Sequence, residues 1–179
     1  MGEEGRRTRR AWFTEDDGDG FDEYTPPGPV MSVTIIPKGR CYSVAKDIIA
    51  RLAHVMGEGS FSQPHITLQG IYNNADLSSV QDSVADVADH SLPFSVNIMG
   101  VGLLVSPTDP NLLFLHLHVE KSATLVDLYA RLKANLDSVG VRTYPFSPPE
   151  WVPHLTLASG RWSRHELLEL LEGLGPSLP

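Results

Sequence analysis

The segment QPHITLQGIY, which occupies residues 63–72, carries the most informative pattern in the sequence. Its apolar and β-branched residues predict a buried strand, yet His65 and Thr67 lie two residues apart within it. Because side chains alternate across a strand, both fall on one face, and Ile66 and Leu68 fall on the other. A histidine and a hydroxyl that share one face of a strand are groups suited to acid–base chemistry and to hydrogen bonding.

The same pattern returns at Pro153, where the chain reads PHLTLASG. His154 and Thr156 repeat the pair, again preceded by Pro and followed by Leu. A single copy is most often a core histidine with satisfied hydrogen bonds beside a threonine that fills a strand. Two copies at matching places in the order of elements favour a shared site, in which both histidines face one ligand. The same alternation groups Gln69 with the first pair and Ala158 with the second.

Length and composition restrict the class of protein to which this chain can belong. A chain of 179 residues that is 41% hydrophobic can form one domain with a substantial core. The net charge of −8 argues against a protein that coats duplex nucleic acid, because neutralising phosphates takes many Lys and Arg side chains. The single cysteine, Cys41, gives no internal disulfide and no cysteine-based zinc site. No apolar run is long enough to span a membrane, so we expect a cytoplasmic protein with no membrane contact.

Strand and helix signals alternate along the chain from about residue 30. Asp76 and Ser122 are placed to cap helices, and Ser163 with Glu166 forms a capping box at the start of another. Gly57 and Gly140 are placed to end helices. The expected strands are residues 30–36, 65–72, 93–105, 112–120 and 154–159, and the expected helices are residues 42–57, 76–90, 122–140 and 163–175.

The order of these elements repeats, which predicts the fold class. Two copies of a βαβαβ unit indicate an α+β protein with two pseudo-symmetric lobes of antiparallel sheet, outer helices and a central cleft. Residues 1–29 are predicted to be a disordered tail, and residues 30–179 to form a single bilobal domain. The first copy continues from its SLP tripeptide into a strand, whereas the second ends at SLP. We therefore expect the last strand to be missing, and a monomer that associates through the open C-terminal sheet edge.

The two motifs resemble those of the 2H phosphoesterase superfamily, and within it the 2′-5′ RNA ligase-like and cyclic phosphodiesterase group. That superfamily is defined by two His-x-Thr/Ser-hydrophobic motifs, and HITL and HLTL match both. The resemblance covers about residues 31–161. It implies that His65 and His154 are catalytic and that Thr67 and Thr156 bind phosphate. The implied activity is metal-independent hydrolysis of a 2′,3′-cyclic phosphate or a 2′-5′ RNA-type linkage in a nucleotide or RNA 3′ end, without a cofactor.

Further residues are candidates for contacts with the substrate. His116 and His118 share one face of the strand LLFLHLHVE and can line the same cleft. Tyr144 and Phe146, in a proline-rich segment before the second motif, can stack on a base. Arg142 can supply positive charge to the same region.

Two other functions remain open at the level of the sequence. The first is a non-catalytic module that binds a nucleotide or an RNA end on the same fold. The second is a metallohydrolase built around His116 and His118, although a third metal ligand is not evident. Dependence of turnover on both motif histidines argues against the binding module, and activity in the presence of a chelator argues against the metallohydrolase. Substrate identity and the choice between hydrolysis and ligation also stay open.

Overall fold

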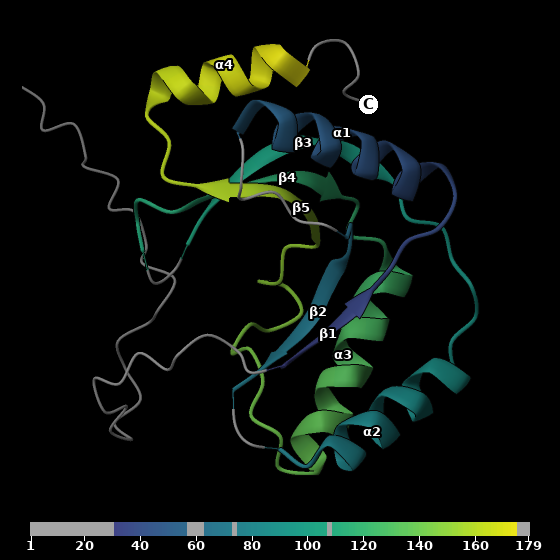
Figure 1. Cartoon of the computed structure of the whole chain (residues 1–179). Helices are drawn as coiled ribbons and strands as arrows, with labels where there is room; N and C mark the ends of the chain where they lie inside the picture. The colour runs from purple at the N-terminus through teal and green to yellow at the C-terminus, as the bar shows by residue number, and fades with distance from the viewer. Residues whose placement is uncertain (1–30, 57–62, 73–74, 107–108, 175–179) are drawn as a thin grey trace, which may run out of the picture.

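The computed structural model describes residues 31–56, 63–72, 75–106 and 109–174 (Figure 1). Within these ranges strands and helices alternate much as the sequence predicts. The strands are β1 (Met31–Ile35), β2 (Ile66–Ile71), β3 (Ile98–Val105), β4 (Leu113–Val119) and β5 (His154–Gly160), and the helices are α1 (Arg40–Met56), α2 (Leu77–Asp89), α3 (Ala123–Ser138) and α4 (Arg164–Leu174). The predicted tail, residues 1–29, and the predicted helix stop at Gly57 lie outside the described residues.

All five strands of the described residues join one antiparallel sheet in the order β1-β2-β5-β4-β3. The α+β class predicted from the sequence is therefore confirmed. The predicted division into two pseudo-symmetric lobes around a central cleft is not confirmed by this topology. The two motif strands, β2 and β5, instead pair with each other at the centre of the single sheet.

The helices cross between the halves of the sequence. Helix α1 from the first half packs against β5 and α4, while α3 from the second half packs against β2 and α2 (Figure 1). The burial of apolar side chains explains this exchange. Leu155 and Leu157 of β5 are fully buried and belong to the same core as Ile48 and Leu52 of α1. Covering these leucines removes apolar surface from water, which is the main favourable term in folding.

The helix ends follow the predicted chemistry. The side chains of Asp76 and Ser122 accept the backbone N–H three residues on, at 3.1 and 3.3 Å, at the starts of α2 and α3. Ser163 and Glu166 form the reciprocal capping box before α4, with bonds of 2.7 and 3.3 Å. Gly140 follows α3 with a φ of 72°, a left-handed conformation that glycine adopts without strain.

The strand predicted for residues 93–105 begins only at Ile98. Its partner on β4 is Val119, the last residue of that strand. One further backbone bond joins Glu120 N to Asn97 O at 2.8 Å, and the ladder stops there. Strand pairing therefore sets this boundary, although the apolar residues before it also favour a strand.

Strand β2 contains an irregularity that changes which side chains reach the core. Thr34 pairs with Thr67 and Val33 pairs with Gln69, so Leu68 is an extra residue in the ladder. Such a β-bulge resets the alternation of side chains. Gln69 is fully buried and does not share the open face with Thr67, which corrects the grouping expected from strict alternation.

Strand β5 has the equivalent irregularity in its own motif. His116 pairs with Thr156 and Leu115 pairs with Ala158, so Leu157 is the extra residue. Ala158 is fully buried, and its predicted place beside Thr156 on the open face is likewise wrong. Both bulges fall on the leucine of a His-x-Thr-Leu motif, so the two motif strands share a local geometry that the sequence repeat did not reveal.

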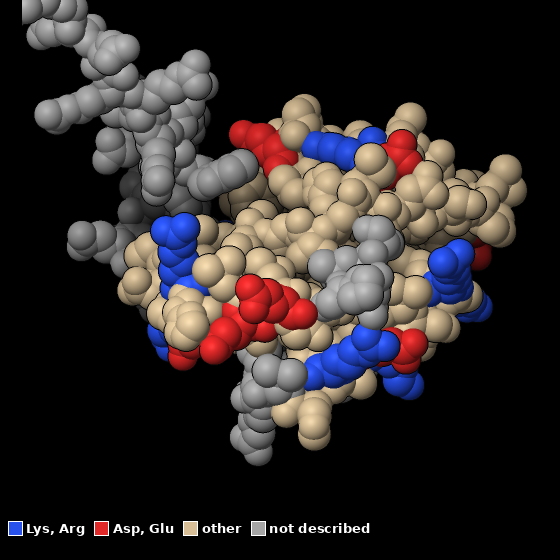
Figure 2. Space-filling model, turned by 90° about the horizontal axis from the view of Figure 1, so that it is seen from above, with Lys and Arg blue, Asp and Glu red and all other residues tan. Residues whose placement is uncertain are grey.

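The face formed by α1 and α4 carries charges of both signs. Lys and Arg side chains and Asp and Glu side chains are both scattered over the view from above (Figure 2). Across the part of the chain that the structure describes, none of the helices combines the length and the apolar character that crossing a membrane requires.

The buried face of β5 should dominate stability. We expect Leu155→Ala to lower the free energy of unfolding by about 2–5 kcal/mol, because it leaves a cavity beneath α1 in addition to losing buried apolar surface. Leu92→Ala is the matched control, because Leu92 is 85% exposed, and its effect should stay within about 0.5 kcal/mol. Urea denaturation followed by circular dichroism measures both. Similar shifts in the two variants would contradict the placement of Leu155.

Candidate active site

The site is built around one backbone pairing. Strands β2 and β5 pair at a single position, between Ile66 and Leu155, and both side chains are fully buried. Because side chains alternate along a strand, the residues on either side of this pair project from the opposite face of the sheet. All four of these flanking residues are partly exposed, and they are the predicted quartet of His65, Thr67, His154 and Thr156. The structure therefore brings the two motifs together.

The two motif imidazoles are held by the same local bond. Nδ1 of His65 lies 2.9 Å from Gln63 O, and Nδ1 of His154 lies 2.8 Å from Val152 O. A carbonyl oxygen only accepts, so each Nδ1 carries a hydrogen and donates it. Nε2 is then the proton acceptor of each ring in its neutral form. The two histidines thus present the same nitrogen for chemistry.

The environment of His154 favours its neutral form. Burial lowers its pKa below the usual 6.5, and this effect outweighs the bond to Val152 O, which acts in the opposite direction. The positive charges of His65 and His118 lower the pKa further. His154 is therefore neutral at pH 7 and can take up a proton.

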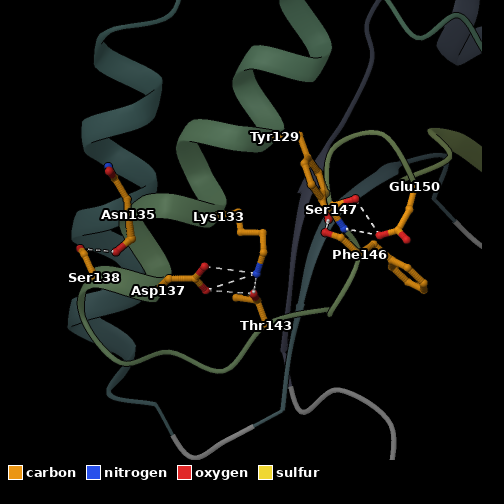
Figure 3. Close-up of polar contacts among 9 residues, drawn as sticks. All are labelled: Tyr129, Lys133, Asn135, Asp137, Ser138, Thr143, Phe146, Ser147 and Glu150. Atoms are coloured by element: carbon orange, nitrogen blue, oxygen red, sulfur yellow. Dashed lines mark hydrogen bonds and ion pairs between the residues drawn. The ribbon is translucent and has the colours of Figure 1, made fainter. Parts of the chain in front are cut away.

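The segment that leads into the second motif is anchored on β2 and α3. The indole N–H of Trp151 donates to Thr67 O at 3.3 Å, which joins the start of the second motif to the first motif strand. The Trp151 ring stacks on Tyr129 of α3, with centroids 4.4 Å apart and planes 17° apart. The Tyr129 hydroxyl donates to Phe146 O at 2.8 Å (Figure 3). These contacts fix the position of β5 relative to β2.

Polar contacts along the same segment support this anchoring (Figure 3). Nζ of Lys133 donates to the hydroxyl of Thr143 at 3.0 Å and pairs with Asp137 at 3.2 Å. Glu150 accepts from both the backbone N–H and the hydroxyl of Ser147, at 2.9 and 2.7 Å. The first set ties the start of the segment to α3, and the second closes a turn immediately before Trp151.

Two further histidines, on β4, lie next to His154. His118 pairs with His154 in the β4–β5 register, and His116 pairs with Thr156. The His116 ring lies 5.3 Å from the His154 ring, centroid to centroid, and 6.3 Å from the His118 ring. Burial lowers the pKa of His116 to about 4, with smaller contributions from His154 and His118. The sequence singled out both residues, but only His118 is exposed, whereas His116 is 4% exposed.

The other candidate contacts lie towards the far end of β2. The Tyr144 ring covers Gly70, and its backbone N–H donates to Gly70 O at 3.1 Å. Tyr144 also meets Tyr72 edge to face, with centroids 5.4 Å apart, and burial raises the pKa of Tyr72 to about 12. Arg142 is exposed, and its backbone carbonyl oxygen accepts a hydrogen bond from the backbone N–H of Tyr72. Phe146 is partly buried and packs against the core. Substrate contact by these residues stays a prediction.

Two residues of this region were not predicted from the sequence. Gly102 of β3 pairs with His116, and the His116 ring occupies the space where a side chain at position 102 would stand. Thr34 of β1 pairs with Thr67. A glycine inside a strand is a recognised sign that another group approaches closely, so the sequence did contain a signal for Gly102. Within the described ranges, no three His, Cys, Asp or Glu side chains form a group that could hold a metal ion.

Comparison with protein families gives a match over most of the chain. The sequence model of the 2′-5′ RNA ligase superfamily matches residues 43–178, a range that contains both motifs. The chain belongs to the 2′-5′ RNA ligase superfamily. The resemblance inferred from HITL and HLTL is thereby confirmed. A search of curated proteins gives no match for the chain.

The buried His116 should make the stability of this superfamily member depend on pH. Between pH 6.5 and about 4 the unfolded chain binds a proton at His116 and the folded protein does not. Lowering the pH through this window therefore favours unfolding, and the stabilisation that is present above pH 6.5 is lost towards pH 4. We expect His116→Phe, which cannot titrate, to reduce the loss of unfolding free energy between pH 7 and pH 4 by roughly 2–3 kcal/mol.

Urea denaturation at the two pH values checks this expectation. His165→Phe is the control, because the His165 side chain is 83% exposed and its removal should leave the pH dependence nearly unchanged. An identical pH dependence in the wild type and in His116→Phe would show that His116 is not a buried neutral imidazole.

Proposed function

We propose that this superfamily member is a metal-independent phosphodiesterase that hydrolyses a 2′,3′-cyclic phosphate or a 2′-5′ RNA-type linkage. One observation carries the proposal: two His-x-Thr motifs flank the single β2–β5 pairing on one face of the sheet. Both imidazoles are oriented by the same backbone bond through Nδ1. Two proton-transfer groups and two hydroxyls around one position match the needs of a displacement at phosphorus.

The environment of the histidines suggests a division of roles. His154, with its lowered pKa, is the group suited to remove a proton from the attacking water. A bond forms between the water oxygen and phosphorus, and the bond from phosphorus to one ribose oxygen breaks. The leaving oxygen takes a proton from His65, which has the acid role because the base role falls to His154. The product is a phosphomonoester, and the proton gained by His154 returns through solvent to His65.

The two threonines have a different task in this scheme. The hydroxyls of Thr67 and Thr156 are each two residues from a motif histidine and on the same face of the sheet. A hydroxyl can donate to a non-bridging phosphate oxygen, where negative charge accumulates as the water attacks. Hydrogen bonds that strengthen in the transition state lower the barrier directly.

The nucleoside attached to this phosphate needs a path across the same face. We infer that it extends along β2, because this direction leads to Tyr144, whose ring lies over Gly70. An aromatic ring of this kind can stack on a base without reading its identity. Arg142, exposed at the same end of the strand, adds positive charge for a further phosphate of an RNA 3′ end.

A panel of substrates tests the proposed reaction. It contains 2′,3′-cyclic nucleotides, 2′-5′ and 3′-5′ dinucleotides and ADP-ribose cyclic phosphate, each incubated with and without a chelator. We expect turnover of a cyclic phosphate or a 2′-5′ linkage that the chelator does not change, with a 2′- or 3′-phosphomonoester as product by ³¹P NMR. Binding without turnover across the panel would favour the non-catalytic module, and activity abolished by the chelator would favour a metal-dependent reaction.

Turnover should require both motif histidines. Acid–base catalysis typically contributes about 10²–10⁴-fold, so His65→Ala and His154→Ala should each lower kcat by roughly this factor. Thr67→Ala and Thr156→Ala should have smaller effects, of about 10–100-fold, because each removes one hydrogen bond to a charged group. His165→Ala, an exposed histidine on α4, is the matched control and should leave kcat unchanged. An unchanged kcat in His65→Ala or in His154→Ala would contradict the proposed reaction.

A further inference from the structure

The site has approximate twofold symmetry in its motifs but not in its neighbours. On one side β1 places Thr34 opposite the motif threonine Thr67. On the other side β4 places His116 opposite the motif threonine Thr156. The two pairings are equivalent, because each lies directly next to the bulge of its motif strand. The second motif, which contains His154, therefore has a neighbouring histidine at the position where the first motif has a neighbouring threonine.

His116 is confined on three sides. Its Nδ1 lies 3.4 Å from Phe114 O, at the long end of hydrogen bonding. Its ring lies against Gly102, where a Cβ would be only 2.8 Å from Cε1 and Nε2 of the imidazole. Its ring also meets the His154 ring at 67°, with the centroids 5.3 Å apart, and lies 6.3 Å from the His118 ring. The absence of a side chain at Gly102 thus allows the ring to lie beside His154.

We propose that His116 is a positioning residue, whose imidazole packs between Gly102 and His154 and fixes the orientation of the His154 ring. This inference rests on the proposed function, because it assigns His116 to the reaction that His154 performs. Tilted contacts between rings at this separation are favourable and directional. A catalytic group displaced by as little as 1 Å can lose about 10²-fold in rate, so a rigid neighbour has a kinetic consequence.

The pKa values of the histidines around His154 agree with this role. The titratable groups that interact with His154 are His65, which immediately precedes β2, and His116 and His118 on β4. His116, with a pKa of about 4, stays neutral when His154 accepts its proton and adds no opposing charge. The His116 ring lies against the His154 ring, whose lowered pKa is caused first by burial. Removal of the His116 ring should then move the pKa of His154 back towards 6.5.

Four variants separate this role from general stability. His116→Ala removes the ring, and His116→Phe keeps a ring of similar shape without the nitrogens. Gly102→Ala adds a methyl group that displaces the ring towards His154, and the double variant carries both alanines. Gly173→Ala is the matched control, since a Cβ there meets nothing within 4 Å.

We expect kcat to depend on whether a ring at position 116 packs against His154. His116→Ala and Gly102→Ala should each lower kcat by about 10–100-fold with KM nearly unchanged, while His116→Phe should stay within about threefold of the wild type. In the double variant the new methyl group enters space that the ring has left. The combined loss should therefore be smaller than the product of the single losses. Multiplicative losses, or equal losses in His116→Phe and His116→Ala, would overturn the proposal.

NMR titration of the histidine Cε1–H signals gives a readout that does not depend on activity. In His116→Ala the pKa of His154 should rise, and in His116→Phe and Gly173→Ala it should stay at the wild-type value. A change limited to stability would not move this pKa, so an unshifted His154 in His116→Ala would contradict the proposed positioning. If the wild type turned over no cyclic or 2′-5′ substrate, the proposed function would fail, while the titration would still decide the packing role of His116.

Discussion

The pairing of Ile66 with Leu155 is the constraint on which the arrangement of the site depends. It is the only register position that joins β2 to β5 in the described residues, and each partner directly follows a motif histidine. With both apolar side chains buried, the alternation of the strands turns the two His-x-Thr pairs towards the opposite face. A register shift of one residue would place the histidines beneath the helices and the apolar residues in water. Burial of apolar surface on one face therefore sets the geometry of the polar groups on the other.

The two bulges limit how far this polar face extends. Each lies on the leucine that follows a motif threonine, and each turns the next residue into the core. Gln69 becomes fully buried on β2, as does Ala158 on β5. The hydrophobic core thus closes immediately beyond the four residues that we assign to the reaction. The exchange of α1 and α3 between the halves of the chain then covers both motif strands on their apolar side.

The sequence was sufficient to predict that each His-x-Thr pair shares one face of its strand, because alternation over three residues is not affected by the bulges that follow. The same reasoning failed for Gln69, because a bulge depends on pairing with a neighbouring strand and leaves little trace in the strand's own sequence. The helix caps at Asp76 and Ser122 were predictable, because capping is a local interaction. The assembly of the strands into one sheet was not predictable. The order of elements along the chain does not determine which helix covers which strand. The approach of His116 to Gly102 also depends on pairing between strands, although the glycine itself was a visible sign.

In the proposed reaction His65 and His154 act on one phosphate held between them. The most direct test follows both histidines by NMR while a nucleoside 2′- or 3′-monophosphate, the expected product, is added to the wild-type protein. A bound phosphomonoester carries negative charge, and a nearby negative charge raises the pKa of an imidazole. We expect the pKa values of both histidines to rise together, and the rise to follow a single binding curve. A rise at only one histidine, or binding that changes neither, would contradict it.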